Sequence, residues 1–562
     1  MANEELRPLG ETLDSRQRWL LLISLMAALF VGAIDQTVVS TATPSIVADL
    51  GGFGLLSWLF TSYMLASTVV IPLVGKLSDI YGRKMFVIAG IVIFTISSAA
   101  CGAAPTMLTL IAFRAVQGFG GGMIFASVFA TIGDIFPPAE RGKYVGMFTG
   151  TFSLASILGP TVGGFLTDSV DWRWVFYINV PFSLIAIPAI WFNLPSRRGV
   201  RRPKIDFVGA ALLSIASVLL LLALVWAGDK YRWASPEIIS IFAAVVVFVA
   251  LFIVQERRHP EPMLPLHLFR NPIFVVANLI VFMLGAGMFG VLAYLPTFVQ
   301  TALGASATAS GIITTPQSAG LLVASVVGGQ IIARTGHYKW QTTIGGLVAV
   351  AGMAGLAMLD VSTSRLRISG IMIVLGVGFG LIMPTMSLVV QNAVPYQYLG
   401  VASSSSQFFR QIGMVLGTAI FGAVLATSYN GAFHEQLSPA DQASIPAPAL
   451  KAFDDPTLAL SKTTFARVQS EIRATSDSDG QRLLDTALAA QREAIAIATR
   501  HLFTLALAAS VVTVVLTLFL KEAPLRRDFK TAEEGAAPIP DSPDATAEAR
   551  EAAPGPGSAG RT

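Results

Sequence analysis

GKLSDIYGRK, which spans Gly75–Lys84, has a counterpart in the second half of the chain, GQIIARTGHYK at Gly329–Lys339. Aligned without gaps, the two stretches share glycine at their first and eighth positions. A second echo pairs QGFG at 117–120 with VGFG at 377–380. The first pair joins two apolar runs in each half of the chain, and the second pair lies inside one. The pattern predicts an internal repeat.

The apolar runs around these echoes are long enough to cross a membrane, which takes about 20 mostly apolar residues. Fourteen such runs are predicted, at 19–42, 56–76, 85–104, 107–133, 142–167, 174–194, 206–227, 236–255, 273–299, 308–333, 341–360, 367–393, 401–428 and 499–520. If the seventh and eighth runs are an inserted pair, the echoes occupy matching places in two sets of six. Such parallel repeats are a known transporter plan, with substrate handled between the halves. The predicted fold class is all-α integral membrane, with two six-helix halves and two linking helices.

The composition agrees with a chain surrounded by a lipid bilayer. Of 562 residues, 54% are hydrophobic and 13% are charged, whereas a soluble domain has about 25% charged residues. The net charge of +4 does not indicate a nucleic-acid partner. The single cysteine, Cys101, has no partner in the chain for a disulfide, and we expect it to be a packed thiol.

The short loops differ in charge between the two sides of the predicted membrane. Loops such as PPAERGKY and RTGHYKW, on the side of both termini, are rich in Lys and Arg, and the opposite loops hold few. Cytoplasmic loops carry such an excess. We therefore expect a multi-pass protein of the cell (plasma or inner) membrane with both termini in the cytoplasm.

The polar stretches complete the predicted domain organisation. Residues 429–498 separate the last two spans, and apolar residues recur there at every third or fourth position, which indicates helices. The residues after Leu520 are rich in Pro, Ala and Glu, which indicates disorder. The predicted parts are a cytoplasmic N-terminus (1–18), an N-terminal six-helix half (19–194), a linker with two extra spans (195–272), the first five helices of the C-terminal half (273–428), an extracytoplasmic helical insertion (429–498), the last span (499–520) and a disordered cytoplasmic tail (521–562).

Three further motifs follow one another on the apolar runs: AIDQTVVSTATPSI at Ala33–Ile46, RAVQGFGGG at Arg114–Gly122 and GPTVGG at Gly159–Gly164. With these and GKLSDIYGRK, the chain resembles the major facilitator superfamily up to about Leu520. Specifically, it resembles the fourteen-helix drug:proton antiporter branch, which contains bacterial quaternary-ammonium and multidrug exporters.

The resemblance implies a major facilitator fold and proton-coupled antiport by alternating access, without enzyme activity. It implies export of hydrophobic or cationic drugs, or of similar amphipathic small molecules, and hence a role in antibiotic resistance. It implies no cofactor beyond the proton gradient, and we expect a monomer. The sequence departs from an even repeat, because Ala333 stands opposite Asp79 and Val374 opposite Arg114. The charged residues of these motifs therefore lie in the first half.

Asp35 lies in the first apolar run and Arg114 in the fourth. Ionisable residues in a span are costly, and they usually face a partner, the bundle interior or a water-filled cavity. Burial favours the neutral form of a carboxyl group and a nearby cation favours the ionised form. We expect Asp35, with Arg114 as its neighbour, to load and unload the proton. The alternative is a static ion pair that fixes the first helix against the fourth.

The stretch at Gly75–Lys84 is interpreted as part of a cytoplasmic gate. Gly75 and Gly82 allow a tight turn and close helix approach. Asp79 can pair with Arg83, with Asp134 at the end of the fourth run as a third member. The alternative is a solvated loop whose cations only set the topology.

Two further groups of residues are candidates for function. Gly159, Pro160, Gly163 and Gly164 form the antiporter motif of the fifth helix, where proline can kink the helix and glycine permits close packing. Possible cavity residues are Tyr63, Gln117, Gln407 and Arg410.

Other functions lack their motifs. No phosphate loop of the form G-x-x-x-x-G-K-[ST] and no H-E-x-x-H is present, and the five histidines are scattered, so no metal site is predicted. Two transporter alternatives remain: a lipid or glycolipid exporter of the cell envelope that uses 429–498 to bind a partner, and a transporter of basic amino acids or other metabolites.

Overall fold

The computed structural model describes residues 13–51, 55–196, 205–227, 230–456, 458, 462–474 and 479–525. The predicted tail beyond residue 525, most of the predicted N-terminal segment 1–18 and the linker residues 197–204 lie outside the described residues. Within the described chain, fourteen helices are long and apolar enough to cross a membrane, and no strand occurs. The predicted all-α fold with fourteen spans is therefore confirmed.

The helices follow the predicted runs closely. The first six spans are α2 (Ser15–Leu50), α3 (Leu56–Tyr81), α4 (Arg83–Gly102), α5 (Met107–Ile135), α6 (Pro138–Ser169) and α7 with α8 (Trp174–Tyr177 and Asn179–Asn193). The linking pair is α9 (Phe207–Trp226) and α10 (Pro236–Arg258). The last six are α11 (Pro272–Thr297), α12 (Ala307–Thr335), α13 (Lys339–Ala357), α14 (Arg365–Asn392), α15 (Leu399–Gln436) and α19 (Asp479–Phe519).

Two helices extend well beyond the membrane-spanning runs predicted for them. α15 has 38 residues and α19 has 41, so both continue into the 429–498 segment. The helix α15 ends only at Gln436, shortly before Pro439 begins the next helix. Hydropathy marks where a chain leaves a bilayer, but a helix continues into water until a breaker or cap ends it.

The segment between these two helices forms a small helical cap. It contains α16 (Pro439–Ser444), α17 (Ala447–Ala452) and α18 (Lys462–Arg473). Tyr429 and Phe433 of α15 stack with each other, Phe433 also stacks on Phe453, and the Tyr429 hydroxyl donates to the Phe453 carbonyl at 2.7 Å. Burial of these aromatic rings anchors the cap on α15.

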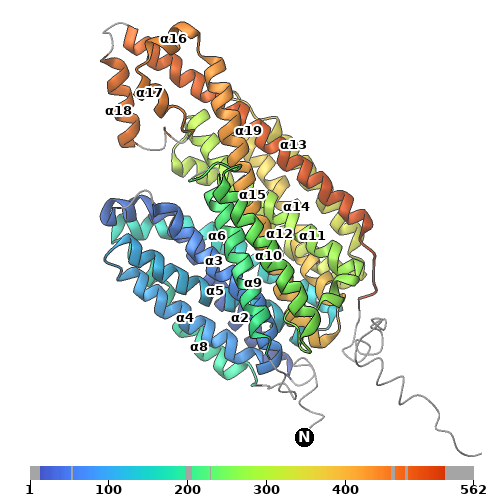
Figure 1. The fold of residues 1–562 in the computed structure, drawn as a ribbon. Coiled ribbons are helices and arrows are strands. Elements are labelled where there is room, and N and C mark those ends of the chain that lie inside the picture. The colour runs from blue at the N-terminus through green and yellow to red at the C-terminus, as the bar shows by residue number, and fades with distance from the viewer. Residues whose placement is uncertain are drawn as a thin grey trace, which may run out of the picture.

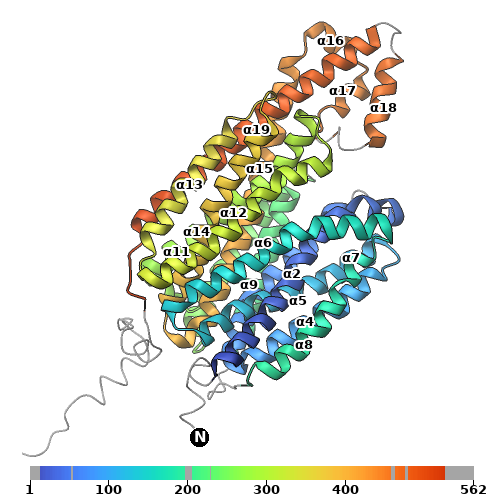
Figure 2. The ribbon, with the colours of Figure 1, turned by 180° about the vertical axis from the view of Figure 1, so that it is seen from behind.

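Figure 1 shows the two six-helix halves as two bundles, with the cap at one end and the N-terminus at the other. We call the face at which α2 begins and α19 ends the terminal face, and the opposite face the cap face. In Figures 1 and 2 the bundles lie together at the terminal face and diverge toward the cap face. The halves meet mainly where α6 packs on α12 and where α3 packs on α15.

The packing between halves is tight because small residues face each other. A Cβ on Gly75 of α3 would overlap the side chain of Ser404 on α15. A Cβ on Gly146 of α6 would overlap the backbone of Ser325 on α12. Such small residues let membrane helices approach closely. The linker is held to the first half by an ion pair between Lys76 and Glu261, with 3.2 Å between Nζ and Oε2.

Candidate functional site

Asp35 of α2 is fully buried and its carboxylate accepts three hydrogen bonds. Arg114 Nη1 donates to Oδ2 at 2.6 Å, while Gln117 Nε2 and Asn179 Nδ2 donate to Oδ1 at 2.8 and 2.9 Å. Arg114 and Gln117 lie one turn apart on α5, and Asn179 begins α8. Three donors thus satisfy the carboxylate although it is removed from water. The structure thus brings Asp35 and Arg114 together.

Arg114 has further partners besides Asp35. Its Nη1 also donates to Gln117 Oε1 at 2.8 Å, and its Nε donates to the Leu59 carbonyl at 3.3 Å. Its guanidinium carbon lies 4.5 Å from the centre of the Tyr63 ring, in a cation–π contact. These contacts hold the guanidinium in addition to its bond with Asp35.

Asn179 is the member of this cluster that sequence reasoning missed. Its amide also donates to Ser98 Oγ at 3.0 Å, and that hydroxyl donates to the Phe176 carbonyl at 2.8 Å. The available signal was an amide side chain inside the apolar run 174–194, although nothing in the sequence places that run beside α2.

The predicted gate residues also come together, at the terminal face. Arg83 Nε donates to Asp134 Oδ2 at 2.8 Å, and Arg83 also pairs with Asp79. Asp79 in turn accepts from the backbone N–H groups of Gly400 and Val401, both at 3.1 Å, at the start of α15. Free N–H groups at a helix start attract a carboxylate. The charges of the first half are thus bonded directly to the second half, and Gly82 makes the turn between α3 and α4 with φ of 92°.

The glycine motif of α6 lies against α2 close to Asp35. A Cβ on Gly159 would overlap Thr37, and a Cβ on Gly163 would overlap Thr41. Pro160 lies within α6, and the Thr37 hydroxyl donates to the Ala155 carbonyl at 3.2 Å. Gly164 differs, because a Cβ there would meet nothing within 4 Å. Gly159 and Gly163 therefore belong to the contact between α6 and α2.

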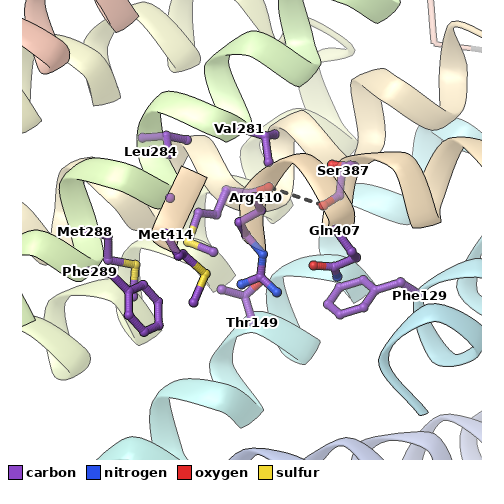
Figure 3. Close-up of a pocket in the computed structure, with 13 residues that line it drawn as sticks. Phe129, Thr149, Val281, Leu284, Met288, Phe289, Ser387, Gln407, Arg410 and Met414 are labelled. Atoms are coloured by element: carbon purple, nitrogen blue, oxygen red, sulfur yellow. Dashed lines mark hydrogen bonds between the residues drawn. The ribbon is translucent and has the colours of Figure 1, made fainter. Parts of the chain in front are cut away.

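A cavity lies between the two halves (Figure 3). It is lined by Phe129, Thr149, Val281, Leu284, Gly285, Met288, Phe289, Met383, Ser387, Ser406, Gln407, Arg410 and Met414. An adjoining pocket shares Phe289, Gln407, Arg410 and Met414 and adds Gln36, Ile71, Phe125, Phe152 and Gln411. The walls are therefore mostly apolar, with a few amides and one guanidinium.

The four predicted cavity residues fall into two pairs. Gln407 and Arg410 line the cavity, one turn apart on α15. Tyr63 and Gln117 are not among its lining residues, and they are buried around Arg114 in the first half instead. Figure 3 shows the Arg410 guanidinium directed into the cavity between Met414, Thr149 and Phe129.

The halves are hydrogen-bonded to each other at mid-depth and on the terminal side of the cavity. Thr68 Oγ1 donates to Gln411 Oε1 at 2.6 Å near the middle of both helices. Toward the terminal face, Ser325 Oγ donates to the Gly146 carbonyl at 3.2 Å. Together with the Asp79 contacts, these bonds close the cavity toward the terminal face.

Among the residues that the structure describes, no group of three or more His, Cys, Asp or Glu side chains is placed to hold a metal ion. The chemistry available in the two sites is therefore that of a buried ion pair, amides and an apolar cavity.

The chain was compared with known families and proteins. A family model described as Major Facilitator Superfamily matches residues 25–418. The multidrug transporter protein MdtP of Bacillus subtilis (strain 168) is 40% identical over 423 residues, which cover 75% of this chain and 78% of that protein. Multidrug resistance protein 3 of the same organism is 38% identical over 418 residues, covering 74% and 81%. Among solved structures, the proton:xylose symporter XylE has a TM-score of 0.58 at 14% identity, covering 92% of this chain and 99% of that one, a likeness of fold alone.

Proposed function

This chain belongs to the Major Facilitator Superfamily, a family of transporters rather than enzymes, and we propose that it is a proton-coupled antiporter of the cell membrane. In this proposal it exports hydrophobic or amphipathic small molecules, including drugs, by alternating access, and both termini lie in the cytoplasm. The observation that carries the proposal is the fully buried Asp35 carboxylate inside a membrane span. Such a residue is costly and is a functional candidate by default.

A proton would compete with Arg114 for the carboxylate oxygens of Asp35. When Asp35 is ionised, Arg114, Gln117 and Asn179 hold it between α2, α5 and α8. Protonation removes the charge attraction to Arg114, whose contacts with Leu59, Gln117 and Tyr63 persist. Loading a proton therefore loosens α2 from α5 without leaving an isolated cation in the bundle.

The change at Asp35 reaches the other half through α6. Thr37 and Thr41, on the same helix as Asp35, pack on Gly159 and Gly163 of α6. At its other end α6 packs on α12, where Gly146 meets Ser325. Movement of α2 is thereby transmitted to the contact between the halves, which must open and close in alternating access.

The cycle follows from this arrangement. The state described here, closed toward the terminal face, is the outward-facing one if that face is cytoplasmic. Asp35 takes a proton from outside, and substrate leaves. After the halves rock to the opposite state, Asp35 releases its proton to the cytoplasm and substrate enters the cavity.

The names of the two Bacillus subtilis relatives support drug export, because both cover most of the chain. A basic amino-acid substrate fits the cavity poorly, because no acidic side chain is among its lining residues. Export of a lipid or glycolipid is the second candidate. It is favoured by a groove beside α15 toward the cap face, lined by Trp233, Ile420, Ala423, Val424, Thr427 and Ser428.

The proposal is tested by transport in proteoliposomes under an imposed pH gradient, with Asp35→Asn as the variant. Asp49→Asn is the matched control, because Asp49 lies on the same helix but is exposed and pairs with Arg173 at 2.8 Å. We expect Asp35→Asn to abolish gradient-driven drug transport and Asp49→Asn to retain it. Gradient-driven transport that survives unchanged in Asp35→Asn would refute the coupling role.

A further inference from the structure

Arg410 is a cation inside the membrane-spanning bundle without a carboxylate partner in the described part of the chain. Its Nε is buried and has no hydrogen-bond partner, while the rest of the guanidinium reaches the cavity. A guanidinium does not lose its proton in a protein. Because an uncompensated charge in a span is costly, we expect the countercharge to come from outside the protein.

Three other buried cations are treated differently. Arg114 is paired with Asp35, Arg83 with Asp79 and Asp134, and Lys76 with Glu261. The fold thus neutralises the cations that it uses to hold helices together. Arg410 instead projects into a space that a ligand can occupy.

The cavity has no site for a positive charge. None of the residues lining it or the adjoining pocket is Asp or Glu. Asp35 is fully buried within the first half and already accepts three hydrogen bonds there. A cationic ligand would therefore meet Arg410 without a carboxylate to offset the repulsion.

The remaining walls suit an apolar body of variable shape. Met288, Met383 and Met414 supply flexible thioethers, and Phe129 and Phe289 supply aromatic rings. Gln407 lies one turn from Arg410 on the same helix, so that its amide is placed to donate beside the guanidinium. The cavity thus combines one anion-binding corner with an adaptable apolar surface.

We propose that this cavity selects amphipathic compounds with an anionic head, such as a carboxylate, sulfonate or phosphate, which Arg410 binds. The direction of export rests on the proposed function, whereas the binding preference does not. This proposal narrows the amphipathic substrates of the proposed function to anionic ones, and it differs from the hydrophobic or cationic drugs that the family resemblance implied.

The test compares three probes that share one fluorophore and differ in head charge: dansyl-glycine, dansyl-glycinamide and dansyl-aminoethyl-trimethylammonium. Binding is measured by dansyl fluorescence on the purified full-length protein in a non-ionic detergent. We expect the carboxylate to bind at least about tenfold more tightly than the amide, as one charge-assisted hydrogen-bonded contact predicts. Equal or tighter binding of the cationic probe would overturn the proposal, and this comparison needs no variant.

Variants assign the preference to one side chain. Arg410→Gln is expected to weaken dansyl-glycine binding by about tenfold and to leave the amide unchanged, with partial recovery in Arg410→Lys. Arg365→Gln is the control, because Arg365 is an exposed cation at the start of α14. An unchanged preference in Arg410→Gln would contradict the assignment. Asp35→Asn should keep the binding preference while losing coupled transport, so the two proposals fail separately.

A competition experiment identifies the source of the anion. Dihexanoyl-phosphatidylglycerol and its zwitterionic phosphatidylcholine counterpart are added below their micelle concentrations to the protein with dansyl-glycine bound. Displacement by the phosphatidylglycerol but not by the phosphatidylcholine identifies an anionic lipid as the ligand class. Displacement by neither identifies small organic acids, and equal displacement by both would argue against recognition of the anionic head.

Discussion

Asn179 donates a hydrogen bond of 2.9 Å to Asp35 from the first turn of α8, 144 positions further along the chain. It is a neutral donor to a carboxylate that also faces Arg114. Its amide adds a hydrogen bond to the carboxylate without adding a second cation. The bond also ties the sixth span to the first, so the Asp35 cluster includes three helices.

Asn179→Ala is therefore expected to change the pH dependence of transport. The variant removes one of the three hydrogen bonds that the Asp35 carboxylate accepts, so the pH at which transport is half-maximal should shift. The measurement is the pH profile of drug efflux from proteoliposomes. Ser183→Ala on the same helix is the control, because its hydroxyl is buried without a recorded partner. An unshifted profile in Asn179→Ala would contradict the role of this bond.

Asp79→Asn should weaken the closure at the terminal face. The carboxylate pairs with Arg83 and accepts from the backbone of Gly400 and Val401, and an amide offers only part of this attraction. The readout is labelling of Thr149→Cys in the cavity by an impermeant maleimide applied from the terminal face, in a Cys101→Ser background. We expect several-fold faster labelling than without Asp79→Asn. Identical labelling rates would show that the charge cluster does not hold this side closed.

Gly163→Val and Gly164→Val test whether the glycine motif of α6 acts through its packing on α2 or only through being rich in glycine. A side chain at Gly163 would overlap Thr41 and the backbone of Val38, whereas a side chain at Gly164 meets nothing within 4 Å. We expect Gly163→Val to lose most transport through the displaced α2–α6 contact, and Gly164→Val to retain it. Transport rates normalised to the amount of folded protein decide this. Equal losses in both variants would mean that the contact with α2 is not what matters.

The cap is predicted to loosen in acid. The Ser438 hydroxyl and the Arg482 guanidinium hold the pKa of Asp441 below its usual value, through bonds of 2.7 and 3.0 Å. A carboxyl group with a lowered pKa stabilises the folded form at pH above its unfolded pKa, and this contribution is lost as the pH falls through the folded value. The protection factors of residues 439–452 against hydrogen exchange, corrected for the intrinsic rate at each pH, should therefore fall below about pH 4. Asp441→Asn should remove this component of the pH dependence; an identical pH dependence in that variant would assign the change to another group.

Much of the Asp35 cluster was predictable, because its signal is electrostatic. An acid and an arginine in separate apolar runs are each costly, and their pairing is the simplest resolution. Asn179 was not predictable in the same way, since a single amide near the start of a span does not by itself indicate a functional site. Only the packing of α8 against α2 assigns its partner.

The surroundings of Arg410 in the cavity could not be predicted from the sequence either. The sequence places Arg410 within a span, but whether an acid lies opposite it depends on how helices distant in the chain pack together, which local patterns do not encode. Likewise, the lengths of α15 and α19 were underestimated because their polar turns leave the bilayer while remaining helical.

The central claim is that Asp35 carries the exchanged proton. Its most direct test is proton release by the purified protein in weakly buffered solution when a transported compound is added, measured over a range of pH with a pH-sensitive dye. The account predicts release from the wild type and from Asp49→Asn, and none from Asp35→Asn with substrate binding retained. Release of the same number of protons from Asp35→Asn would contradict it.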